Sequence, residues 1–425
     1  MTTPTTTHTP PPPEASASAP TAVTPPPQSG NPWRPTFHGV SLMTRIELRR
    51  RRPTTKGYVF YGILFGLVIA ICVAAAVFAP AQLSSTNFEI VLIMVLGVGM
   101  LIAPSLSATS INGDSSEGVL APLQMSHLTA GDIAVGKLLA SWTVSVIALV
   151  AVSPFLIYTF VSSGWTVLEM LTTVGAILLV VMAFTAVGLA WSSIAARAVA
   201  SVALAHLTTG FFLIGTLIVF GVAGLLVTEE SSQRDHYIDW NALSPEAESA
   251  LDNAYMTGDY TNLNIDDYSC LESEWAYTVT HTERVSWIVL MNPAVMIIET
   301  APIVDPETWE EDGRAAPGAF AMLHSALSEA RMGPDNDINQ YQAYDECAEL
   351  ATMIDNNVAS DEDLEAQWEA QNSAWEQRQQ ELANLERAPW IGLGVSGALL
   401  VGSMWIVIRR LRVPYKTLRT GTRVA

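Results

Sequence analysis

Six long apolar stretches limit what this chain can fold into more than any other feature of its sequence. Each runs for about 19 residues or more with almost no charged side chain, which is the length a helix needs to cross the hydrocarbon of a bilayer. Because a backbone in lipid must satisfy its own hydrogen bonds, such segments favour helices. The sequence predicts an all-α polytopic membrane protein with six transmembrane helices, at residues 58–79, 90–111, 138–162, 167–192, 199–227 and 390–408.

The distribution of Lys and Arg predicts how these spans are oriented. Seven of the 21 basic residues precede the first span, and six follow the last one. Basic residues close to the ends of spans favour the cytoplasmic side. We therefore expect a multi-pass protein of the plasma (inner) membrane with the N- and C-termini in the cytoplasm. The long segment between spans five and six is then outside.

That outer segment, residues 229–388, is strongly acidic. It holds 34 of the 41 Asp and Glu residues but only six of the 21 basic ones. We expect a large, mainly helical extracytoplasmic domain whose charge keeps its surface solvated; attraction of cations or of a basic ligand is the alternative interpretation. Its two cysteines, Cys270 and Cys347, are expected to form a disulfide, because the outer compartment is oxidising.

Two parts of this outer segment have patterns of their own. Residues 285–300 are apolar but too short to cross a membrane, and Asn292-Pro293 interrupts them. This pattern predicts either two short helices that re-enter the outer interface or a core of the outer domain. Residues 360–387 predict a long helix with an interrupted apolar stripe, which packs on its own domain or on a second subunit.

The segments at either end of the chain have different compositions. Residues 1–36 are rich in Pro and Thr and predict a disordered cytoplasmic tail. Residues 37–56 predict a basic amphipathic helix at the cytoplasmic interface, before spans one to five within 57–228. The sixth span, within 389–408, is followed by a basic cytoplasmic tail at 409–425. Four consecutive cations of the interfacial helix are expected to anchor it to lipid headgroups: Arg49, Arg50, Arg51 and Arg52.

The chain carries no motif for chemistry of its own. It has no Gly-rich phosphate loop ending in Gly-Lys-Ser/Thr, no Cys or His pair with zinc spacing, and no Gly-X-Ser-X-Gly nucleophile motif. We expect no catalytic residue, no metal, no cofactor bound by this chain and no nucleic-acid partner. His206 is an ionisable group well inside a span, where a hydrogen bond to a neighbouring helix is favoured over a role in transport.

A polar connection at residues 112–137 joins the second and third spans. Asp114 and Glu117 stand at its leading end, and Leu120, Leu123 and Met125 form the apolar part of a short segment after Gly118. A small helix with an apolar face and one or two charges can dock in a groove of another protein. An ordinary solvated loop is the alternative.

The order of residues in this connection resembles the cytoplasmic coupling loop of the permease (transmembrane) subunit of type-2 ATP-binding-cassette exporters. The basic entry helix, the Asn-Pro element and a C-terminal ending similar to that of actinobacterial members extend the resemblance. The loop differs from the family pattern at Ser116, Val119 and Ala121. It matches the pattern at Glu117, Gly118, Leu120, Ile133, Gly136 and Lys137.

This resemblance implies a function in transport. The chain would form a translocation pathway with a second permease subunit, identical or homologous, and the second and fifth spans would line it. A separate ATPase subunit would bind ATP and Mg and contact the loop 112–137. Export is favoured over import, and membrane lipids are the surrounding partners.

Two other functions are compatible with the topology. A membrane scaffold or sensor would use its acidic outer domain to bind an extracytoplasmic partner and would need no ATPase. A secondary carrier or channel is disfavoured, because the spans lack charged residues and show no inverted repeat.

Overall fold

Among the residues that it describes, the computed structural model is mostly helical and contains a two-stranded sheet. It describes residues 31, 33–51, 55–78, 84–150, 152–301, 318–334, 345–356, 373, 376–378, 380–382 and 385–412. The predictions for the tail 1–30, for Arg52, for most of the helix 360–387 and for residues 413–425 lie outside the described residues.

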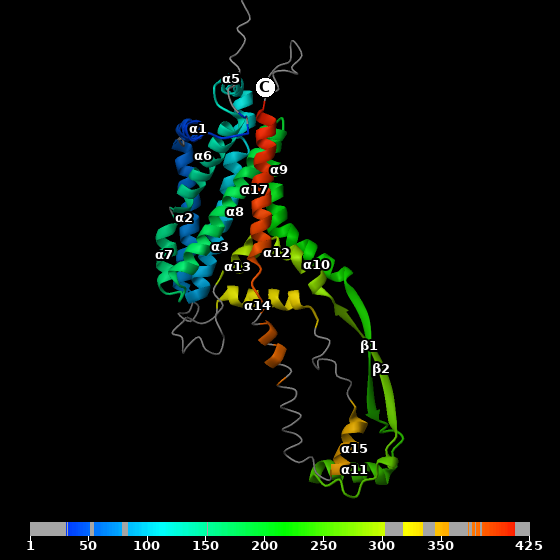
Figure 1. Ribbon diagram of the computed structural model, residues 1–425. Coiled ribbons are helices and arrows are strands. Elements are labelled where there is room, and N and C mark those ends of the chain that lie inside the picture. Colours follow the sequence, from blue (N-terminus) through cyan, green and yellow to red (C-terminus); the bar gives the residue numbers. More distant parts are fainter. Residues whose placement is uncertain are drawn as a thin grey trace, which may run out of the picture.

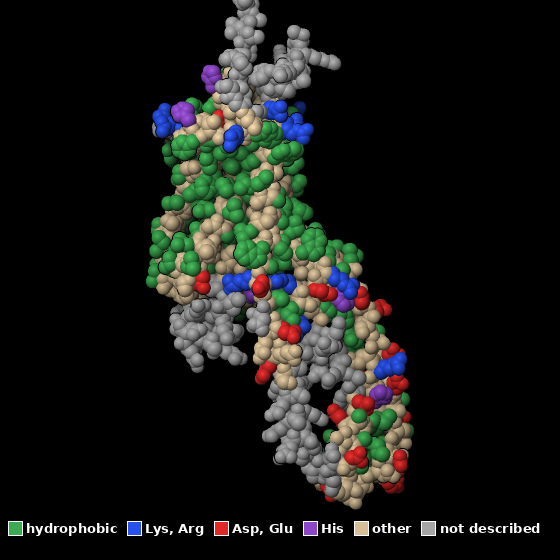
Figure 2. Space-filling model, viewed as in Figure 1, with side chains coloured by type: hydrophobic (Ala, Val, Ile, Leu, Met, Phe, Trp, Pro, Cys, Tyr) green, Lys and Arg blue, Asp and Glu red, His purple; other side chains and the backbone are tan. Residues whose placement is uncertain are grey.

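Long helices pack side by side into one bundle (Figure 1). Within the described residues, five are long and apolar enough to cross a membrane, and an apolar band covers the face of the bundle seen in Figure 2. A further 24-residue helix, α2, lies beside α3 and α7. The bundle consists of α2 (Thr55–Phe78), α3 (Ser84–Ser107), α6 (Ala130–Val150), α7 (Ser153–Val161), α8 (Val167–Ile194), α9 (Ala198–Gly210), α10 (Thr216–Leu226) and α17 (Pro389–Leu411).

Helix α8 forms the centre of this bundle and packs on α3, α6, α9 and α17. A capping box at Thr166 and Glu169 starts it. Toward the C-terminal end of α8, a Cβ at Gly188 would collide with the side chain of Ser107 and the backbone of Pro104, so glycine here permits close packing of α8 on α3. Phe184 and Ile177 are buried in the same core as Phe88 of α3.

The predicted third span, 138–162, is two helices in the structure. α6 ends at Val150, and α7 begins at Ser153 with Pro154 in its first turn. A proline has no N–H to donate to the preceding turn, so it begins a helix more easily than it continues one.

The predicted fifth span contains a π-helical turn, η2 (Phe211–Gly215), between α9 and α10. Such a turn leaves a carbonyl without its α-helical partner. The Nδ2 of Asn292 donates to the Leu213 carbonyl over 2.8 Å and to the Thr216 hydroxyl over 3.0 Å. An amide from a distant segment thus stabilises the irregular turn.

Asn292 also begins a helix of the interrupted apolar segment. Its Oδ1 accepts from the N–H of Ala294 over 2.8 Å, which caps α13 (Pro293–Ile298) after the short α12 (Ser286–Leu290). Both helices lie at the end of the bundle, where α13 packs on α17 and α12 packs on α10 (Figure 1).

Helix α14 (Ala319–Met332) runs across this same end of the bundle (Figure 1). Glu89 of α3 accepts from the N–H of Phe320 over 2.9 Å, at the N-terminus of α14. Glu299 lies 2.9 Å from the ring of His324 and accepts from the N–H of Ala388 over 2.8 Å, just before α17. Two buried carboxylates therefore fasten α14 to the ends of three other segments.

The described residues of the outer segment form more helix than strand, but they also contain a long antiparallel ribbon that the sequence did not predict. β1 (Thr228–Ile238) pairs with β2 (Cys270–Thr280) over eleven residues each, from Thr228↔Thr280 to Ile238↔Cys270. β1 is almost entirely polar, so its sequence has none of the apolar alternation that predicts a half-buried strand. The strand forms because its backbone pairs with β2, not because an apolar face is buried.

A small core closes the tip of the ribbon, where α11 (Pro245–Thr257), η3 (Ile265–Asp267) and α15 (Glu346–Asn356) gather (Figure 1). Near the other end of the ribbon, η4 (Thr282–Arg284) follows β2. The core at the tip consists of Ile238, Leu251, Ala254, Tyr260, Tyr268 and Leu350.

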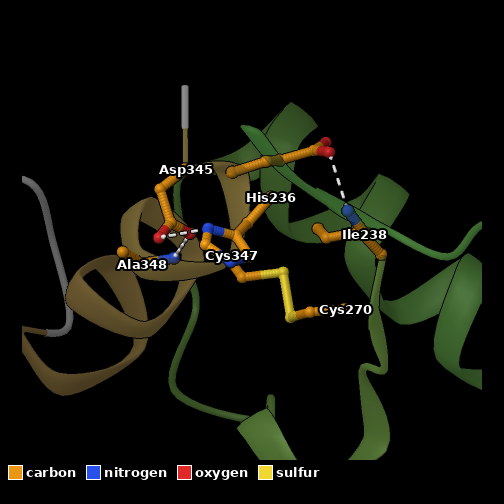
Figure 3. Close-up of a disulfide and its surroundings, with 7 residues drawn as sticks. His236, Ile238, Cys270, Asp345, Cys347 and Ala348 are labelled. Carbon is orange, nitrogen blue, oxygen red and sulfur yellow. Dashed lines mark hydrogen bonds and ion pairs between the residues drawn. A yellow bond between two sulfur atoms is a disulfide. The ribbon is translucent and has the colours of Figure 1, made fainter. Parts of the chain in front are cut away.

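The predicted disulfide is confirmed. Cys270 and Cys347 are joined by an S–S bond of 2.04 Å, which links β2 to α15 (Figure 3). Two polar contacts lie close to it: His236 is 3.2 Å from Asp345, and Glu346 accepts from the N–H of Ile238 over 3.0 Å.

Replacing Cys270 and Cys347 by serine is expected to release α15 from the ribbon. Closing a loop with a separation of 77 residues stabilises the folded state by about 4 kcal/mol in the chain-entropy model. Hydrogen exchange should therefore accelerate at the α15 amides and stay unchanged at the α8 amides. Equal protection of α15 in both proteins would show that its other contacts suffice.

Acidification should weaken the attachment of α14 through Glu299. Burial would raise the pKa of Glu299, but the hydrogen bonds from His324 and Ala388 and the charges of His324 and Arg331 outweigh it and hold this pKa below its ordinary value of 4.5. The stabilisation is thus complete above about pH 4.5 and is lost as the pH falls through the lowered pKa. The difference in thermal unfolding midpoint between the wild type and Glu299→Gln should shrink in that range. A constant difference would contradict the assignment.

Candidate functional site

The end of the bundle opposite α14 holds α1 (Phe37–Arg50), which packs against α6 (Figure 1). A Cβ at Gly136 would lie 2.6 Å from the Cβ of Met43, so glycine permits the close crossing. At the start of α1, Asp132 of α6 accepts hydrogen bonds from the backbone N–H and the hydroxyl of Thr36. The predicted interfacial helix is thus tied to the third span along its length.

The polar connection between α3 and α6 folds into two short helices, α4 (Ser110–Ser116) and α5 (Leu120–Met125). Gly118 joins them with a φ of 72°, in the left-handed region that favours glycine. The backbone conformation at Gly118 therefore explains why this position of the loop pattern is a glycine.

Lys137 of α6 is the centre of a buried charge network beneath these helices. Its side chain is fully buried, and its Nζ lies 2.6 Å from Asp114 Oδ2 and 3.2 Å from Glu47 Oε2. It also donates to the Ser110 carbonyl over 3.1 Å. One ammonium group thus joins α1, α4 and α6.

Two arginines at the C-terminal end of α1 complete this network. Arg50 lies 2.8 Å from Asp114 and 2.9 Å from Glu117, so it links both acidic residues of the connection. Arg51 lies 2.9 Å from Glu47 and donates to the Leu106 carbonyl of α3 over 2.7 Å. Three cations and three carboxylates therefore balance in formal charge.

Glu47 shows that the network is electrostatically favourable. Burial by itself would raise its pKa, yet the charges and hydrogen bonds of Lys137 and Arg51 hold the pKa below the ordinary value. Sequence reasoning missed Glu47 as a site residue. Arg50 and Arg51 follow Glu47 by three and four residues, and such spacings put side chains on one helix face. This spacing was the sequence signal that could have indicated an ion pair at Glu47.

The predicted coupling residues divide into buried and exposed groups. Asp114 is buried in the network, and Leu120 is buried in a cluster with Ile111 and Ile133. Leu123 is half-buried against the same cluster. The side chains of Glu117 and Met125 remain 64% and 61% exposed and are the ones a partner could touch.

Helix α5 has a further attachment, to the last helix of the bundle. The side-chain amide of Gln124 is buried and donates to the carbonyl of Leu411 over 3.0 Å, at the end of α17. The short helix is therefore connected directly to α17 and, through α4, to α6 and α1.

The remaining predicted site residues lie elsewhere. Arg49 is exposed beside the network, and Asn292 and Pro293 lie at the opposite end of the bundle. His206 forms the expected interhelical hydrogen bond, with its Nε2 2.9 Å from the Ser105 hydroxyl of α3. Within the part of the chain that the structure describes, no group of three or more His, Cys, Asp or Glu could hold a metal ion.

Replacing Lys137 by methionine should strongly destabilise the bundle. It would leave Glu47 and Asp114 buried and close together with one cation fewer, and breaking a buried pair in this way costs about 3–5 kcal/mol. Thermal unfolding in detergent measures the loss. Arg410→Met is the control, because Arg410 is exposed and forms no ion pair within the described residues. Equal midpoints for the two variants would contradict a structural role of the network.

No protein-family model, curated protein or solved structure matches this chain.

Proposed function

We propose that this chain is the permease subunit of an ATP-driven transporter, with export the favoured direction. It would cross the plasma membrane six times, with α2 as the first span and both termini in the cytoplasm. Two permease subunits would form one pathway, and separate ATPase subunits would bind ATP and Mg.

The attachment of α5 carries this proposal. A motor that acts on membrane helices needs a short, firmly held contact element on its side of the membrane. α5 is joined to α17 by Gln124, and α4 is joined to α6 and α1 by Lys137 and Arg50. A displacement of α5 would therefore be transmitted to several long helices, as expected of elements that move as rigid bodies.

The charge distribution supports the orientation. Arginines of α1 and the C-terminal end of α17 gather at one end of the apolar band, whereas carboxylates gather on the ribbon and its tip at the other (Figure 2). This polarity agrees with a cytoplasmic position of α1 and α5.

The exposure of α9 and α10 supports a dimer. In the most apolar 18-residue stretch of α9–α10, 11% of the residues are buried within this chain, whereas the corresponding share in α8 is 72%. The polar pair of Ser105 and His206 lies where α3 meets α9. Polar groups in a span favour a protein neighbour or a water-filled path over lipid. A pathway between two subunits, lined by α3 and α9–α10, would provide both a protein neighbour and a water-filled path.

The outer tip favours a second candidate, a scaffold or sensor that binds an extracytoplasmic partner. The tip is held by the disulfide, is rich in carboxylates, and exposes Met256 to 87% and Trp240 to 43%. Aromatic side chains and methionine are enriched at protein interfaces.

A reciprocal pair of substitutions separates these candidates. Met125→Glu puts a charge on the exposed face of α5, and Met256→Glu puts the same charge on the outer tip. We expect an ATPase to co-purify with the wild type and with Met256→Glu, and its recovery to fall at least about tenfold with Met125→Glu, because a desolvated charge costs more than 1.4 kcal/mol in an apolar contact. Mass spectrometry of the purified complexes measures the recovery.

The opposite pattern would overturn the transport proposal. If no ATPase is recovered with the wild type and Met256→Glu releases an envelope protein, the chain acts as a scaffold. Unchanged thermal unfolding of both variants is the control for folding.

A further inference from the structure

A large apolar cavity opens between α1, α2 and α6. Its volume is about 1080 Å³, whereas small-molecule pockets are typically about 300–1,000 Å³. Phe65 of α2 and Leu139 and Ile147 of α6 line its apolar part. Arg45 and Arg49 of α1 line it as well.

The cavity extends through about one leaflet of a membrane. α1 crosses α6 at the level of Lys137, which pairs with Glu47. The lining residue Ala148 lies eleven residues further along α6. At about 1.5 Å per residue this is roughly 16 Å, close to half of the ~30 Å thickness of the hydrocarbon.

Two of the lining cations are free to bind an anion. Arg51 also lines the cavity, but its charge is paired with Glu47. Arg45 and Arg49 are exposed and form no ion pair within the part of the chain that the structure describes. They lie four residues apart on α1 and thus on one face, and guanidinium groups suit the oxygens of a phosphate.

We propose that this cavity binds one anionic glycerophospholipid of the cytoplasmic leaflet. Its phosphate group contacts Arg45 and Arg49, and its acyl chains lie between α2 and α6. Basic pockets between helices on the cytoplasmic side suit such headgroups. The bound lipid fills the space that separates α2 from α6 and holds α1 at the crossing where the charge network forms. This is a defined site, distinct from general attraction of the arginines to a membrane surface, and it does not depend on the transport proposal.

Native mass spectrometry of the full chain, delipidated in mild detergent, tests the site. Phosphatidylglycerol and phosphatidylcholine with identical acyl chains are the two probes. We expect one phosphatidylglycerol per chain to be retained in preference to phosphatidylcholine. Arg45→Gln with Arg49→Gln should weaken phosphatidylglycerol binding roughly twenty-five-fold, since each basic residue near an anionic headgroup contributes about a factor of five.

Two further variants distinguish a built site from a basic surface. Arg409→Gln with Arg410→Gln removes two cations from the same end of the bundle outside the cavity and should leave binding unchanged. Gly62→Phe should abolish retention of the lipid, because Gly62 lines the cavity and a Cβ there meets nothing within 4 Å. The proposal is overturned if both arginine pairs have the same effect, if the two lipids bind equally, or if Gly62→Phe binds like the wild type. Unchanged thermal unfolding verifies that each variant is folded.

Discussion

The buried ammonium group of Lys137 is the interaction on which the arrangement of this end of the molecule depends. A cation without access to water is stable only where carboxylates and carbonyl groups surround it. Here Glu47 and Asp114 provide the carboxylates, and Ser110 provides a carbonyl. These groups come from α1 and α4, so neither helix can leave α6 without exposing an unpaired charge to a low-dielectric interior. An apolar contact of the same size would allow the helices to shift along one another, whereas the ion pairs of Lys137 fix the positions of α1 and α4 on α6.

The opposite end of the bundle uses the same principle with other groups. Glu89 and Glu299 bind backbone N–H groups at the beginnings of α14 and α17, and Asn292 binds the carbonyl released by the π-helical turn. Polar side chains therefore hold the helix ends, while close packing such as that of Gly99 of α3 on Val181 of α8 holds the middle. Among the five candidate membrane-spanning helices in the described part of the chain, α9–α10 is the least buried, and it contains the π-helical turn. Such turns occur often at functional sites, in keeping with a moving or subunit-contacting role for this pair.

The two ends of the molecule therefore differ in charge and in the elements that they present. The basic end presents a short helix joined to α17 by Gln124 and a cavity suited to a lipid, and the acidic end presents a disulfide-linked tip on a long ribbon. In the proposed permease, the ATPase contacts the basic end, and the acidic end is accessible to an extracytoplasmic partner. The two assignments are compatible, because the attachments of α5 and of the tip share no residue.

The apolar stretches, the basic end, the acidic outer segment and the pairing of Cys270 with Cys347 could be predicted from the sequence alone, because length, composition and residue count are local properties of a chain. The sequence also indicated Asp114, Glu117 and Lys137, but not what they do. Only the tertiary structure decided that Asp114 and Lys137 are buried partners, that Arg50 and Arg51 turn toward carboxylates, and that the polar segment Thr228–Ile238 forms a strand. The physical reason is the same in each case: a charge pair or a strand ladder is defined by two segments that lie far apart in the chain, and neither segment by itself records the position of the other.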